Sequence, residues 1–166
     1  MPDIADRLAE LEAEAAIRRV AARYMALCDE PRTAAPGLDF EDLFTSDLVW
    51  EGAGPKASAE FARIEGRDAL LAWFGAMRNP PKYALNVHFL TSEAISVDGG
   101  RATGTWVMFQ AAARASGEGE LRMARISIRF RHDEGRWRMA HFQTESLFRL
   151  DAGAEQTAAL LQGGAA

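Results

Sequence analysis

What this sequence lacks narrows its possible functions. Its 166 residues include a single cysteine, Cys28, so no internal disulfide can form, and we expect a reducing compartment, the cytoplasm. The sequence has no run of 18 apolar residues, the length that a membrane-spanning helix needs, and residues 1–30 contain no signal-peptide core. The net charge of −5 and the absence of a basic stripe argue against nucleic acid as a partner.

Familiar catalytic motifs are missing as well. The chain has no Gly-x-Ser-x-Gly elbow, no phosphate-binding loop, no Rossmann fingerprint and no CxxC pair. Its three histidines are well separated, and no His-Glu-x-x-His helix is present, which gives little support for zinc. We therefore expect neither a cofactor nor a metal site.

The first third of the chain has helical periodicity. Apolar residues recur at steps of three or four from Ile4 to Leu27, with Glu and Arg between them. Pro31 disfavours helical geometry in the residue before it, so this helix should end near Cys28 or Asp29. Asp39 is placed to cap a short helix through Phe44. Residues 47–51 then read as a strand, and residues 69–77 as a second helix.

The second half reads as an antiparallel sheet. Short links that contain glycine, typical of hairpins, separate four strand-like runs at about 83–97, 101–114, 120–132 and 136–149. Helices followed by hairpin strands indicate an α+β fold. We expect one domain over residues 1–150 and a flexible tail over residues 151–166, frayed from Ala152.

The strand over residues 102–112 predicts self-association. Both of its alternating faces carry apolar residues, so neither face looks freely solvated. Helices can cover one face and a second copy of the chain the other. We therefore predict a homodimer or homotrimer.

His88 and Asp29 stand out by their settings. His88 lies between Val87 and Phe89, where water is scarce, and is either a core histidine with a satisfied hydrogen bond or a general base. Asp29 follows a helix C-terminus, where the macrodipole disfavours a carboxylate. It is either a solvated loop residue or the partner of a nearby imidazole.

Other residues are candidates for a pocket. Tyr24 lies on the apolar stripe of the first helix, either as an interior ring or with its hydroxyl in a pocket. Tyr24 and Asp29 can share a pocket only if the helix end unwinds or bends. A flat hydrophobic ligand would suit apolar walls and a few polar contacts, for which the candidates are Trp50, Trp106 and Met108 as walls and Asn86, Gln110, His141 and Glu145 as polar groups.

Five segments, in this order and spacing, resemble the SnoaL-like branch of the nuclear transport factor 2-like superfamily. They are IRRVAARYMALCD (17–29), LFTSDLVW (43–50), GRDAL (66–70), NVHF (86–89) and DEGRW (133–137). The resemblance covers roughly residues 5–150 and implies a cone-shaped domain in which N-terminal helices pack on a curved sheet around a pocket.

Within that superfamily the sequence looks most like dehydratase-type lyases, such as scytalone dehydratase, bile acid 7α-dehydratase and hexachlorocyclohexane dehydrochlorinase. Those enzymes use an Asp–His pair, and Asp29 and His88 occupy both positions. Tyr24 matches a tyrosine that several relatives use as an acid, whereas Gln110 stands where bile acid 7α-dehydratase carries an acidic residue.

The resemblance implies a cofactor-independent lyase, dehydratase-like, that acts on a hydrophobic cyclic or aromatic hydroxylated small molecule. His88 would remove a proton, Asp29 would orient His88, and Tyr24 would donate to an oxygen. One alternative is an isomerase or cyclase that uses the same base. Another is a binding protein without catalytic activity.

Overall fold

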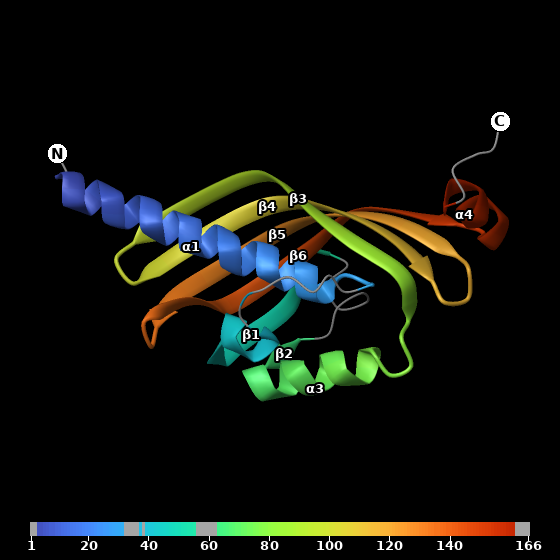
Figure 1. Cartoon of the computed structure of the whole chain (residues 1–166), viewed down its shortest axis with the longest axis horizontal. Helices are drawn as coiled ribbons and strands as arrows, with labels where there is room; N and C mark the ends of the chain where they lie inside the picture. The colour runs from blue at the N-terminus through green and yellow to red at the C-terminus, as the bar shows by residue number, and fades with distance from the viewer. Residues whose placement is uncertain (1–2, 32–36, 38, 56–62, 162–166) are drawn as a thin grey trace.

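The computed structural model describes residues 3–31, 37, 39–55 and 63–161, and shows helices packed on one six-stranded sheet (Figure 1). The strands are β1 (Phe44–Ala53), β2 (Ile64–Glu65), β3 (Tyr83–Asp98), β4 (Arg101–Arg114), β5 (Gly119–Asp133) and β6 (Arg136–Ala152). Their order across the sheet is β2-β1-β6-β5-β4-β3. The predicted α+β class, with N-terminal helices on a curved, mainly antiparallel sheet, is confirmed.

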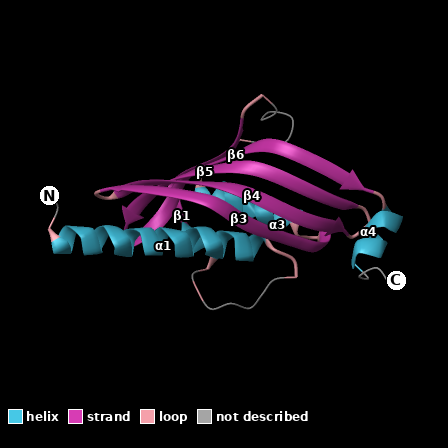
Figure 2. Cartoon of the chain, turned by 90° about the horizontal axis from the view of Figure 1, so that it is seen from above, coloured by secondary structure: helices cyan, strands magenta, loops and turns pink. Residues whose placement is uncertain are grey.

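The sheet is antiparallel except at one place. The strands β3 to β6 form three successive hairpins, as their glycine-bearing links predicted. β1 instead pairs in parallel with β6, next to the short edge strand β2. From above, the sheet curves along its length (Figure 2). This curvature leaves one face hollow, and the helices lie against that face.

Helix α1 (Ile4–Cys28) ends where Pro31 predicted. Its start is stabilised by a reciprocal capping box between Asp3 and Asp6. Its C-terminal half lies on β3 and β6 and buries residues from Ile17 to Met25. The apolar residues of its N-terminal half, Ile4, Leu8 and Leu11, remain exposed where the helix runs past the sheet (Figure 1). The predicted apolar stripe is thus buried only in its second half.

A second helix and a 3-10 turn also pack on the helix-covered side of the sheet. The predicted capping role of Asp39 at this turn is wrong. The helix α3 (Arg67–Met77) packs against β1 and begins two residues before its predicted start. The 3-10 turn η1 (Phe40–Leu43) follows Asp39, but the side chain of Asp39 makes no capping hydrogen bond. Side-chain capping therefore does not initiate this turn.

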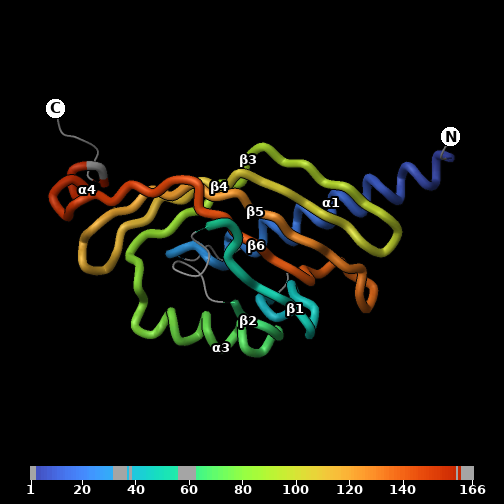
Figure 3. The backbone as a smooth tube through the Cα atoms, turned by 180° about the vertical axis from the view of Figure 1, so that it is seen from behind, coloured from blue at the N-terminus to red at the C-terminus, as the bar shows by residue number. Residues whose placement is uncertain are grey.

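The C-terminal region is more ordered than the sequence predicted. Residues 154–161 form the helix α4 (Ala154–Leu161), and Thr157 is buried against Gly119 at the start of β5. The frayed tail expected from Ala152 is therefore corrected for these residues, while residues 162–166 lie outside the described part of the chain. Seen from behind, α4 and the β4–β5 hairpin lie at the end of the molecule opposite the N-terminus (Figure 3). No helix in the described ranges is long and apolar enough to cross a membrane.

A bulge in β6 decides which of its residues face the helices. Phe130 pairs with Met139, but Arg129 pairs with His141, so Ala140 is an extra residue in β6. Trp137 and Met139 therefore face the helices before the bulge, and Phe142 does so after it. His141 is moved to the opposite, outer face of the sheet, although it shares sequence parity with Trp137.

Candidate active site

The end of α1 brings Asp29 to strand β3. The helix stops at Cys28, and Asp29 adopts an extended conformation with φ −72° and ψ 154°. Glu30 and Asn86 then exchange two backbone hydrogen bonds, each 2.8 Å long. The side-chain amide of Asn86, through Nδ2, also donates to the Cys28 backbone carbonyl at 3.1 Å. These contacts join the helix end to the strand that carries His88.

Asp29 and His88 form a carboxylate–imidazole pair. One oxygen of Asp29, Oδ1, lies 2.7 Å from His88 Nδ1 and accepts a hydrogen bond from the His88 backbone N–H at 3.0 Å. The His88 side chain is only 10% exposed, and the Asp29 side chain is only 20% exposed. A carboxylate at Nδ1 favours the tautomer that carries its proton there, which leaves the lone pair on Nε2. This pair has the geometry that the resemblance implied.

His88 lines a cavity of about 380 Å³ on the helix-covered face of the sheet. This volume is within the range of small-molecule sites. Five other predicted residues also line the cavity, and they come from α1, β1, β3 and β4. They are Tyr24, Trp50, Asn86, Met108 and Gln110. Most of the remaining wall is apolar and comes from Met25, Trp73, Phe74, Met77, Ala124, Ile126 and Phe142.

Tyr24 presents its hydroxyl among aromatic rings. Trp50 Nε1 donates to this hydroxyl at 3.2 Å, and the Tyr24 ring packs 5.1 Å from that of Phe142. Burial, and then the neighbouring Cys28, raises the pKa of Tyr24 well above its ordinary value, so the hydroxyl stays protonated at neutral pH. Tyr24 reaches the same cavity as His88 because α1 ends before Asp29.

The two predicted amides hold each other in place. Gln110 Nε2 donates to Asn86 Oδ1 at 2.6 Å, and both side chains are buried. Asn86 also donates to Cys28, as described above. These bonds orient both amides beside His88, so that they form a polar strip in an otherwise apolar wall.

Three predicted contacts do not line this cavity, and those predictions are corrected. Trp106 is buried nearer the middle of α1, where its Nε1 donates to Glu93 at 3.1 Å. The bulge at Ala140 places His141 and Glu145 on the outer face of the sheet. There His141 contacts Glu51 at 2.8 Å, and Glu145 pairs with Arg125 at 2.8 Å.

Sequence reasoning missed several residues of the cavity. Trp73 and Phe74 form an aromatic wall of the cavity. The sequence predicted their helix, α3, but not that these two side chains face the cavity. Phe142 was missed because its orientation depends on the bulge. The cationic side chains Lys82 and Arg122 were also missed, although Arg122 pairs directly with Gln110 across the sheet.

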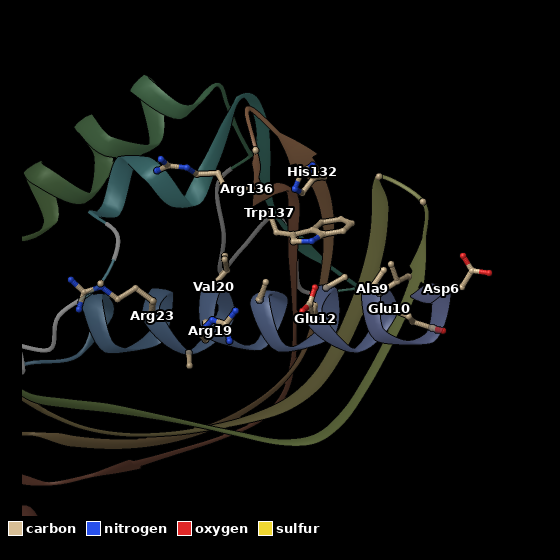
Figure 4. Close-up of a pocket in the computed structure, with 18 of the residues that line it drawn as sticks. Asp6, Ala9, Glu10, Glu12, Arg19, Val20, Arg23, His132, Arg136 and Trp137 are labelled. Carbon is tan, nitrogen blue, oxygen red and sulfur yellow. The ribbon is translucent and has the colours of Figure 1, made fainter. Parts of the chain in front are cut away.

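A second, wider hollow of about 1220 Å³ lies further along α1. Figure 4 shows Trp137 and His132 reaching from the β5–β6 hairpin over this helix. This hollow contains neither His88 nor Asp29. Among the described residues, no group of three or more His, Cys, Asp or Glu side chains could hold a metal ion.

Solved structures share this fold at low sequence identity. An NTF2-like protein with a cystatin-like fold from Novosphingobium aromaticivorans has a TM-score of 0.63 and 24% identity, covering 98% of this chain and 99% of its own. A LinA-type3 hexachlorocyclohexane dehydrochlorinase from Novosphingobium barchaimii has a TM-score of 0.67 and 14% identity, covering 86% and 92%. A protein from Novosphingobium aromaticivorans, described provisionally as a scytalone dehydratase, has a TM-score of 0.70 and 15% identity, covering 86% and 89%.

These likenesses concern the fold. No curated protein matches the sequence closely enough to count as a relative. The sequence family described as the SnoaL-like domain matches residues 9–143, which is most of the chain. By this match, and by the curved sheet with its helix-covered cavity, the protein belongs to the SnoaL-like domain family.

Proposed function

We propose that this protein is a cofactor-independent lyase that eliminates a small group from a hydrophobic cyclic or aromatic hydroxylated compound. The observation that carries the proposal is the 2.7 Å contact between Asp29 and His88 at the wall of an apolar cavity. Two structural neighbours, a dehydrochlorinase and a provisional scytalone dehydratase, are described as enzymes of elimination chemistry.

In the proposed reaction, His88 is the general base. Its Nε2 takes a proton from a carbon of the substrate, and the electron pair of that C–H bond forms a new double bond as the C–O bond breaks. The electron pair of the C–O bond leaves with the hydroxyl oxygen, which takes up the proton from the imidazolium and departs as water. Asp29 stabilises the resulting imidazolium and keeps the ring in its tautomer. Tyr24, which is protonated and buried, donates a hydrogen bond to the departing hydroxyl or to a substrate oxygen on which negative charge develops. Most of the cavity wall is apolar, which strengthens these electrostatic interactions relative to bulk water.

The test is a panel of hydroxylated aromatic, steroidal and polyketide-like compounds, followed by mass spectrometry for loss of water or another small group. The variant His88→Gln should lower turnover by about 10³-fold, which is within the range of general acid–base catalysis. The variant His132→Gln is the matched control, because His132 lines only the wider hollow.

Two outcomes would point elsewhere. A product of unchanged mass that depends on His88 would show an isomerase or cyclase that uses the same base. A compound that binds equally well to wild type and His88→Gln, with no product from either, would contradict the lyase proposal and favour a binding protein.

A further inference from the structure

The cavity that holds His88 is more cationic than a purely apolar ligand requires. Among the described residues that line it, Arg78, Lys82 and Arg122 are cations and only Glu30 is a carboxylate. The whole chain carries a net charge of −5. Positive charge is therefore concentrated in this cavity against the trend of the molecule.

Two of these cations, Lys82 and Arg122, both lie near the buried carboxylate of Glu120. Arg122 shares the buried carboxylate of Glu120 with Arg114 and Arg149, which approach its Oε2 at 3.0 Å and 3.4 Å. Tyr83, next to Lys82, donates to Glu120 Oε1 at 2.9 Å, and the Lys82 carbonyl accepts from Ala115 N at 3.1 Å. One carboxylate thus serves three guanidinium groups beside a lysine.

Lys82 has no carboxylate partner of its own among the described residues. Its Nζ lies 5.2 Å from the centre of the Tyr83 ring, and burial and then Arg114 lower its pKa. The Arg122 guanidinium donates to Glu120 Oε2 at 3.2 Å, and its buried Nε lies 3.2 Å from Glu120 Oε1, so this arginine shares its one carboxylate with Arg114 and Arg149. The other nearby carboxylates are already engaged, Asp151 with Arg149 and Glu118 with Ser116. An anion in the cavity would give Lys82 an ion pair and would add a second negative charge beside Arg122.

The sheet register places these cations relative to the base. His88 pairs with Gln110, and Gln110 pairs with Arg122, so the three residues form a row across β3, β4 and β5. Neighbouring strands are about 4.8 Å apart, so the Cα atoms of His88 and Arg122 are separated by about 10 Å. An anionic group at Arg122 would therefore lie away from the carbon that loses its proton, so its charge would not oppose the negative charge that develops there.

We propose that Lys82 and Arg122 form an anion subsite of this cavity, and that the substrate is a small ring compound that carries a carboxylate. This inference rests on the proposed function for its view of the cavity as a substrate site. The planar guanidinium of Arg122 matches a carboxylate, and Lys82 adds a second charge-assisted hydrogen bond. The volume of about 380 Å³, near the lower end for ligand sites, leaves room for one or two rings with this group.

The test compares two ligands of equal shape, 2-naphthoate and its neutral amide, by calorimetric titration of the intact protein. We expect the acid to bind about tenfold more tightly or better, because it alone supplies the charge. The variants Lys82→Gln and Arg122→Gln should each remove most of this preference. Lys82→Gln breaks no ion pair within the protein, so it tests the subsite even if Arg122→Gln unfolds. Arg125→Gln is the control, since Arg125 pairs with Glu145 on the outer face.

Equal affinity for the acid and the amide, or a preference that survives in the double variant, would overturn the subsite. A more than tenfold preference for naphthyl phosphate over the acid would overturn its assignment to carboxylates. The binding preference should persist in His88→Gln. A failed elimination assay therefore leaves the subsite standing, and a failed subsite leaves the elimination intact.

Discussion

At the level of single residues, Asp29 holds His88 through two contacts to one oxygen. The carboxylate meets the ring at Nδ1 and the backbone N–H of the same residue. In Asp29→Asn an amide replaces the carboxylate, so the imidazolium loses its counter-charge and the tautomer is no longer imposed. We expect kcat to fall by about 10²-fold, which is less than the loss of about 10³-fold expected for His88→Gln.

Steady-state kinetics on a substrate from the compound panel would measure this effect. Circular dichroism of Asp29→Asn should show an intact fold, because the backbone bonds between Glu30 and Asn86 remain. Unchanged turnover in Asp29→Asn would remove Asp29 from the mechanism and leave it as a cap that joins α1 to β3.

Tyr24 has both a structural and a proposed chemical role, and Tyr24→Phe separates them. If the hydroxyl acts mainly in the transition state, kcat should fall more than KM rises. The variant also removes the hydrogen bond that Trp50 Nε1 donates to this hydroxyl, which should destabilise the protein by about 1–3 kcal/mol. Paired kinetic and denaturant-unfolding measurements would show both. A stability loss without any loss of kcat would mean that the hydroxyl has a structural role only.

At the level of elements, β4 depends on a glycine that permits close packing. A Cβ built on Gly104 would lie 2.2 Å from the buried ring of Trp106 on the same strand. Gly104→Ala must therefore displace this ring, and we expect a loss of about 1–3 kcal/mol in the free energy of unfolding. Gly100→Ala is the matched control, because its Cβ would meet nothing within 4 Å. Equal stability of the two variants would contradict this account.

The buried Glu120 links the starts of β3 and β5 to the ends of β4 and β6, and it makes stability depend on pH. Burial opposes its charge, but Arg114, Arg122 and Tyr83 together lower the pKa of this carboxyl. Its stabilising contribution is therefore present above the unfolded value of about 4.3 and is lost as pH falls through the lower folded value. Glu120→Gln should cost about 3 kcal/mol at neutral pH, since it leaves three guanidinium groups without their shared anion.

Urea unfolding of wild type and Glu120→Gln at several pH values would measure this difference. The gap between the two proteins should narrow below about pH 4 as Glu120 becomes protonated in wild type. A gap that stays constant across that range would show that the charge of Glu120 contributes nothing.

At the level of the whole molecule, the outer face of the sheet predicts self-association. Phe89, Met123 and Phe148 are exposed there, and Phe89 and Phe148 are each half exposed. Phe89 pairs with Phe109, Phe109 with Met123, and Met123 with Phe148, so the apolar row crosses four strands. We expect light scattering to give a mass above that of one 18.2 kDa chain, and Phe148→Glu to lower it. A monomer at micromolar concentration would contradict this prediction.

The sequence by itself determined the two long helices and the hairpin strands and their order, but it did not predict β2 or α4. The periodicity from Ile17 to Leu27, Pro31 after the first helix and the glycine-bearing links are local signals, and local signals decide where helices and hairpins form. The resemblance carried by Asp29 and His88 predicted a contact between residues 59 positions apart, and the structure shows it.

Only the tertiary structure decided which side chains share the cavity. The extra residue Ala140 reverses the alternation of β6, so His141 points away from the helices and Phe142 toward them. The partners of Glu120 come from four strands, with Tyr83 in β3, Arg114 in β4, Arg122 in β5 and Arg149 in β6. Strand register and bulges depend on pairing between distant segments, and the orientation of each side chain follows from that pairing.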